Sequence, residues 1–145
     1  MAPIDIEMAH YVHEHMGTNG VSVHVNRRVA AINQHNVVLD NGDVIETDLV
    51  ISAIGVRPDS AIAQLAGIDV NDMGAIKVDS LHRTNDPNVF AIGDATETRT
   101  TDGQAAFIPL AGPANRQGRL VADVIAGRET RVPTSLGTAI LGVFG

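Results

Sequence analysis

Two short apolar runs, each ending at a glycine, constrain the fold of this chain more than any other feature. The first run covers residues 49–54 and is followed by Gly55, and the second covers residues 89–92 and is followed by Gly93. Such runs are typical of strands that are buried on both faces, as in a parallel sheet covered by helices. The sequence therefore predicts an α/β fold with two buried strands, each ending in a turn.

Asp94 comes directly after the second run, and a turn-forming cluster, residues 84–88, comes directly before it. Ligands of open α/β sheets bind at the carboxyl ends of the strands, where a carboxylate can accept hydrogen bonds from sugar hydroxyls. Gly93 would let the backbone pass close to such a ligand. The residues alone equally allow an ordinary strand exit with a solvated aspartate.

A helix is predicted over residues 114–126, because Pro113 suits a first helical turn and Gly127 suits the position just past a helix end. The unpaired N–H groups at residues 110–114 and the positive end of the helix dipole would favour an electron-rich ligand. Leu110, Ala111 and Gly112 are the candidates for this contact. The other interpretation is a capped helix without a ligand.

The remaining segments follow simple periodicities. Apolar residues at helical spacing predict a helix over residues 4–16, and alternating valines predict a half-buried strand over residues 21–25. Residues 37–46 read as a hairpin, in which Asn41 and Gly42 would form a type I′ turn. Two shorter elements are also expected: a helix over residues 61–66 and a strand over residues 75–78.

The composition narrows the function without naming it. The net charge of −7 disfavours nucleic acid and anionic membranes as partners, and no apolar stretch is long enough to span a membrane, so a cytoplasmic location is expected. The chain has no cysteine, so it contains no thiol nucleophile. We therefore expect no catalytic residue in this chain. His10, His13 and His15 lack the spacing of a zinc site, so we also expect no metal.

Together, residues 48–59, 84–94 and 108–119 resemble segments of the FAD-dependent pyridine nucleotide-disulfide oxidoreductases. The likeness is to the branch of coenzyme A-disulfide reductases, NADH oxidases, NADH peroxidases and persulfide reductases, and it extends to residues 3–9 and 135–140. It implies partial doubly wound FAD- and NAD(P)-binding folds with a β-meander, as a fragment of a flavoprotein with two dinucleotide folds.

The resemblance also implies domains and residue roles. Residues 1–55 would be the C-terminal part of the NAD(P)-binding domain, and residues 56–145 the C-terminal part of the FAD-binding domain. Asp94, with Gly93, would bind a ribityl hydroxyl of FAD, and Thr84 would begin the strand beside the flavin. The list of remaining cofactor contacts is Leu110, Ala111 and Gly112 at the pyrimidine side of the flavin, and Gly55 near NAD(P)H.

Two features of the family's pattern are absent: the glycine-rich dinucleotide turn, G-x-G-x-x-G, and the reactive cysteine. We therefore expect a catalytically silent portion of a homodimeric enzyme, in which NAD(P)H reduces FAD and FAD reduces a disulfide, persulfide, peroxide or oxygen. The alternative is a non-enzymatic, self-associating module without bound cofactor. Open sheet edges and the apolar tail at residues 139–144 would favour that association.

Overall fold

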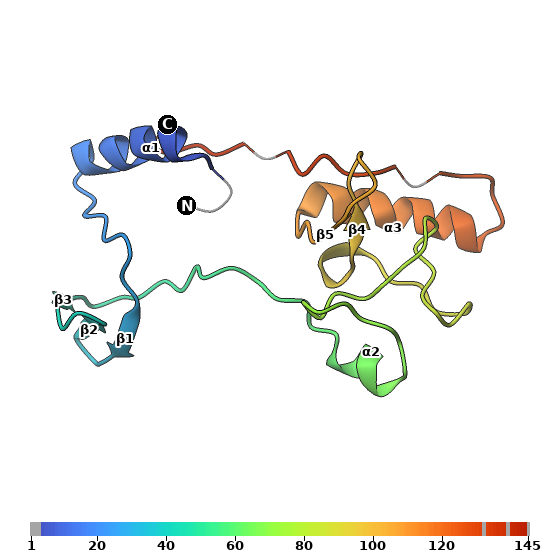
Figure 1. The fold of residues 1–145 in the computed structure, drawn as a ribbon, viewed down its shortest axis with the longest axis horizontal. Coiled ribbons are helices and arrows are strands. Elements are labelled where there is room, and N and C mark those ends of the chain that lie inside the picture. The colour runs from blue at the N-terminus through green and yellow to red at the C-terminus, as the bar shows by residue number, and fades with distance from the viewer. Residues whose placement is uncertain (1–3, 132, 139, 145) are drawn as a thin grey trace. The chain divides into compact units, whose positions relative to one another are not determined.

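The computed structural model describes residues 4–131, 133–138 and 140–144 of the chain (Figure 1). The predicted positions Pro3 and Ala139 lie outside these described residues. The chain divides into two compact units, Met1–Ala53 with Ile140–Gly145, and Ile54–Ala139. The first unit contains one helix and three strands: α1 (Ile6–Thr18), β1 (Val29–Ile32), β2 (Asn36–Leu39) and β3 (Val44–Glu46). The second unit contains α2 (Ala61–Leu65), the 3₁₀ helix η1 (Gly93–Ala95), β4 (Thr98–Arg99), β5 (Ala105–Ala106) and α3 (Ala111–Ile125).

Helix α1 begins and ends through local hydrogen bonds. The Asp5 carboxylate accepts the Met8 N–H at 3.0 Å and so caps the first turn. At the other end, Gly20 has a φ of 80° and donates its N–H to the Gly17 carbonyl, while Val21 donates to the Met16 carbonyl. This pair of bonds is the Schellman motif, which requires a left-handed residue just past the helix. The predicted helix is therefore confirmed.

Strands β1, β2 and β3 form an antiparallel three-stranded meander in sequence order. Val37 and Leu39 of β2 are its buried residues. The predicted hairpin is confirmed, but its turn is not type I′. Gly42 has a φ of 89° and Asn41 does not have a positive φ, so residues 40–42 form a three-residue loop with glycine in the left-handed position.

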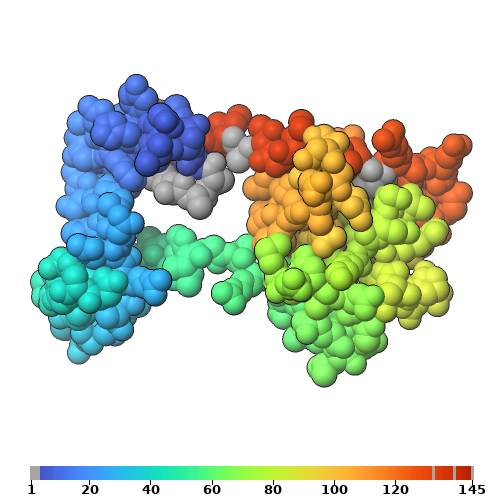
Figure 2. All heavy atoms as spheres, viewed as in Figure 1, coloured from blue at the N-terminus to red at the C-terminus, as the bar shows by residue number. Residues whose placement is uncertain are grey.

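Ile76 connects separate backbone segments of unit 2. Ile76 forms an antiparallel bridge with Val70 and a parallel bridge with Thr96, so it connects two stretches that lie far apart in sequence. Ala75 and Ile76 are buried there. Strands β4 and β5 pair as a hairpin. Figure 2 shows the atoms of this unit, coloured green through orange, in close packing.

Helix α3 matches the prediction at both ends. Pro113 lies in its first turn, and Gly127, with a φ of 72°, donates to the Val124 carbonyl while Arg128 donates to the Asp123 carbonyl. This is a second Schellman end. Helix α2 is also confirmed. Among the described residues, no helix is long and apolar enough to cross a membrane.

Four predicted strands are not formed within the described residues. Residues 21–25 and 49–54 have no strand pairing, and residues 75–78 and 89–92 contribute only isolated bridges, at Ile76 and Phe90. The apolar side chains of residues 49–54 are exposed rather than buried. A strand needs a neighbour that pairs along its length. Among the described residues, 21–25 and 49–54 have no such partner, and 75–78 and 89–92 pair only at single positions.

Candidate functional site

The strongest candidate site is the turn that follows residues 89–92. Gly93 has a φ of 72°, a conformation that favours glycine, and it begins the 3₁₀ helix η1. The turn is closed by Thr96, whose N–H and hydroxyl both donate to the Gly93 carbonyl at 3.1 and 2.9 Å. Asp94 is exposed on this turn. The left-handed glycine thus redirects the chain and places a carboxylate at the surface.

Helix α3 holds this turn in place. The Gly93 N–H donates to Oε1 of Gln117 at 2.7 Å. A Cβ added to Gly93 would lie 3.5 Å from Cβ of Ala114, and one added to Gly118 would lie 3.5 Å from Cδ1 of Ile92. Small residues therefore allow close packing between the helix and the turn, and one buried hydrogen bond joins them.

The first turn of α3 carries the second group of candidates. Leu110 is the N-cap and has no side-chain cap. Its own N–H donates to the Ile108 carbonyl, and the Ala114 N–H donates to the Leu110 carbonyl, while Pro113 has no N–H. Among the described residues, the N–H groups of Ala111 and Gly112 are left without a backbone acceptor. The predicted set of free donors is therefore reduced to these two.

Thr84 has a local structural role. Its hydroxyl donates to the Val89 carbonyl at 3.0 Å, and its N–H donates to the same carbonyl. The next residue pair inward, Arg83 and Phe90, forms a bridge. Thr84 therefore closes the turn that leads into residues 89–92, and its hydroxyl is already engaged.

Gly55 is not brought into this group. It has a φ of 90°, which favours glycine, but a Cβ added there would meet no atom within 4 Å. The structure thus joins Gly93 and Asp94 to the helix that carries Ala111 and Gly112. It gives Gly55 no comparable contact.

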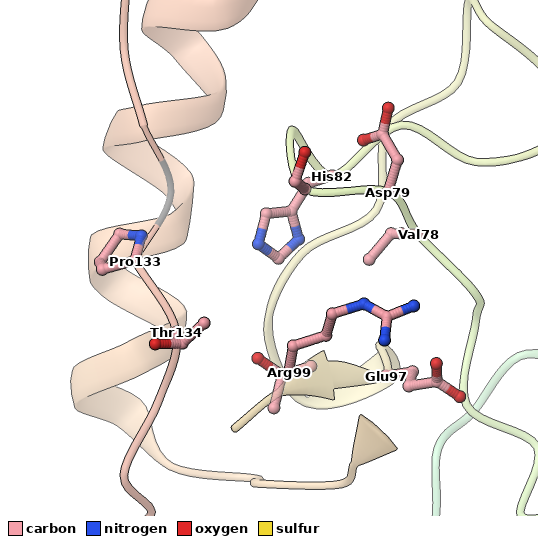
Figure 3. Close-up of a pocket in the computed structure, with 9 residues that line it drawn as sticks. Val78, Asp79, His82, Glu97, Arg99, Pro133 and Thr134 are labelled. Atoms are coloured by element: carbon pink, nitrogen blue, oxygen red, sulfur yellow. The ribbon is translucent and has the colours of Figure 1, made fainter. Parts of the chain in front are cut away.

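Two pockets border this region within unit 2. One, of about 340 Å³, runs along α3 and is lined by Gly112, Arg116, Gln117 and residues 133–136. The other, shown in Figure 3, is lined by Asp79, His82, Glu97, Arg99 and residues 133–134, among others. Among the described residues, no group of three or more histidine, aspartate or glutamate side chains is arranged to hold a metal ion.

His82 is the most unusual side chain of the second pocket. It is 4% exposed and has a φ of 61°, which is uncommon for residues other than glycine, although histidine, asparagine and aspartate adopt it more often than most. Nδ1 lies 3.0 Å from the Ala91 carbonyl, which can only accept, so Nδ1 carries the proton of the neutral ring. Burial lowers the pKa of His82, an effect that the Ala91 carbonyl and Asp79 oppose.

Gln117 and His82 had no role in the sequence interpretation. A signal for Gln117 was present, because Ala114, Gln117, Gly118 and Val121 recur at helical spacing and only Gln117 is polar. A polar side chain within a stripe of small and apolar residues must find a hydrogen-bond partner. His82 gave no such signal, since its burial depends on residues distant in sequence.

Comparison with known proteins identifies the family of this chain. The model of the pyridine nucleotide-disulphide oxidoreductase family matches residues 1–118. The NAD(P)H sulfur oxidoreductase (CoA-dependent) of Pyrococcus abyssi is 37% identical over 105 residues, which cover 72% of this chain and 23% of that protein. The chain belongs to the pyridine nucleotide-disulphide oxidoreductase family, so the resemblance inferred from its motifs is confirmed.

Solved structures agree. The structure of reduced CoADR-RHD from Bacillus anthracis superposes with a TM-score of 0.94 at 44% identity, over 99% of this chain and 27% of that one. An FAD-dependent pyridine nucleotide-disulphide oxidoreductase from Desulfovibrio vulgaris gives a TM-score of 0.80 at 32% identity, over 90% of this chain and 34% of that one. The family comprises FAD- and NAD(P)H-dependent oxidoreductases, and the predicted fold class is confirmed. The chain spans about a quarter to a third of the length of these proteins.

Proposed function

We propose that this chain acts as part of a flavin-dependent oxidoreductase that uses NAD(P)H to reduce FAD and then passes the electrons to a small-molecule acceptor. The observation that carries the proposal is the superposition of 99% of the chain, with a TM-score of 0.94, on a structure nearly four times as long. In this proposal residues 1–55 belong to the NAD(P)-binding side and residues 56–145 to the FAD-binding side.

The described residues fit a flavin. The exposed carboxylate of Asp94 would accept a hydrogen bond from a ribityl hydroxyl, and the left-handed Gly93 turns the chain so that this carboxylate lies at the surface. The free N–H groups of Ala111 and Gly112, with Leu110 beside them, would point toward the electron-rich pyrimidine side of the ring. Thr84 would support the segment beside the flavin, and Gly55 would lie near the nicotinamide.

These residues bind and orient rather than react. Bound FAD would supply the two-electron redox chemistry. Because the chain has no cysteine, a thiol needed for a disulfide or persulfide acceptor has to come from outside these 145 residues. The isolated chain is therefore expected to be catalytically silent, and the working enzyme is expected to be a homodimer acting on a disulfide, persulfide, peroxide or oxygen.

The test is a titration of the 145-residue chain with FAD, followed by flavin fluorescence. Asp94→Ala should abolish saturable quenching, because it removes the acceptor for the ribityl chain. Asp72→Ala is the matched control, since Asp72 is also exposed and lies in the same unit. Equal quenching by the unchanged chain and Asp94→Ala would contradict the assigned role of Asp94.

The exposed apolar segment supports a second candidate, a self-associating module without cofactor. Leu49, Ile51 and Ile54 are 75%, 81% and 95% exposed, although their pattern is that of a buried strand. This candidate is favoured if the purified chain shows no flavin absorbance and sediments as a dimer, while Ile51→Lys sediments as a monomer. A monomer that binds FAD would favour the first.

A further inference from the structure

Gln117 is the only polar residue of α3 that the structure buries among the described residues, with 8% of its surface exposed. Its Oε1 accepts the Gly93 N–H at 2.7 Å. The bond links residues 24 positions apart and is the sole side-chain hydrogen bond recorded between α3 and the turn at Gly93. A buried amide without a partner is costly, so this contact is expected to persist whenever the helix packs on the turn.

The position of Gln117 makes the contact more than a packing feature. Ala111 and Gly112 lie at the start of the same helix, and Asp94 is the next residue after Gly93. The helix is a rigid element, with a rise of about 1.5 Å per residue. The hydrogen bond, together with the close approach of Gly93 to Ala114 and of Gly118 to Ile92, therefore holds the turn that carries Asp94 against the helix that carries the free N–H groups.

We propose that Gln117 is a positioning residue that sets the distance between the carboxylate of Asp94 and the N-terminal N–H groups of α3. The inference rests on the proposed flavin function, in which these two groups hold the ribityl chain and the ring of one molecule. A rigid ligand that reaches both groups binds tightly only when their spacing is held in advance. Gln117 itself touches no ligand in this scheme.

The chemistry of the contact suggests two informative variants. Gln117→Leu has a similar size but no acceptor, so the Gly93 N–H loses its partner. Gln117→Glu keeps an oxygen that can accept this N–H. Gln104→Leu is the matched control, because the Gln104 side chain is exposed and makes no hydrogen bond with the described part of the chain.

Two measurements on the 145-residue chain test the proposal. Hydrogen exchange should show the Gly93 amide about tenfold faster in Gln117→Leu, while the Gly127 amide at the far end of α3 is unchanged. FAD titration should show affinity about tenfold weaker in Gln117→Leu, restored to within about twofold in Gln117→Glu and unaffected in Gln104→Leu. A merely structural defect would also speed exchange at Gly127.

The outcomes separate this inference from the function on which it rests. If the unchanged chain does not quench FAD fluorescence, the flavin proposal fails, and the positioning role fails with it. If the unchanged chain and Gln117→Leu bind FAD equally tightly, only the positioning role is overturned. Unaltered exchange of the Gly93 amide in Gln117→Leu would overturn it as well.

Discussion

Adding one methyl group on either side of the contact between η1 and α3 should have opposite effects on stability. Gly93→Ala and Gly118→Ala each place a Cβ about the same distance from the facing element, 3.5 Å from Ala114 Cβ and 3.5 Å from Ile92 Cδ1. That separation is ordinary van der Waals contact, so neither change creates a clash. The difference between them comes from the backbone alone.

The expected magnitudes follow from the two backbone conformations. Gly93 has a φ of 72°, and a residue with a Cβ there costs about 1–2 kcal/mol. Gly118 lies inside α3 without a positive φ, and glycine in a helix interior is less favourable than alanine by about 1 kcal/mol. Gly93→Ala should therefore destabilise unit 2 and Gly118→Ala should stabilise it, with a gap of about 2–3 kcal/mol between them.

The measurement is urea unfolding followed by far-ultraviolet circular dichroism, supported by hydrogen exchange at the Thr96 amide, whose acceptor is the Gly93 carbonyl. The midpoint should shift down for Gly93→Ala and up for Gly118→Ala, with unchanged slopes. If Gly93→Ala left the midpoint unchanged, or Gly118→Ala lowered it, the assignment of the left-handed turn and its packing on α3 would be wrong.

Three further substitutions test other parts of the structure. Burial lowers the pKa of His82, so its stabilising contribution should be complete above the unfolded pKa of about 6.5 and lost as the pH falls below that value. His82→Asn, which tolerates the left-handed backbone, should flatten this pH dependence in urea unfolding, and an unchanged dependence would refute the role of burial. Gly127→Ala should destabilise α3 by about 1–2 kcal/mol because of its φ of 72°. Gly17→Ala, within α1, should not destabilise the chain. In thermal unfolding, a melting temperature that falls for Gly17→Ala but not for Gly127→Ala would contradict both expectations.

The helices were predictable because their signals are local. Apolar residues at helical spacing, a proline in a first turn and a glycine after a last turn are signals that lie within the helix or directly beside it, so α1 and α3 were placed to within a few positions. The hairpin of β2 and β3 was predictable for the same reason, because one short loop joins the two strands, whereas β1 was not predicted. Only the conformation of that loop was wrong, since Asn41 and Gly42 suit both a two-residue and a three-residue turn.

The strands were not predictable in the same way. Residues 49–54 and 89–92 have the composition of buried strands, but composition does not supply a neighbour to accept their hydrogen bonds. Gly93, Asp94 and the first turn of α3 were each indicated by the sequence. The bond that joins them through Gln117 was not, because it depends on residues 24 positions apart.

Helices α1, α2 and α3 all end in the same way, with glycines 20, 67 and 127 in the left-handed conformation just past the last turn. The C-terminal boundary of each helix is thus encoded within its own few residues. A ribosome extending this chain would release the residues that end each helix directly after the helix itself. Later partners would then have only to cover exposed faces, without redefining where any helix stops.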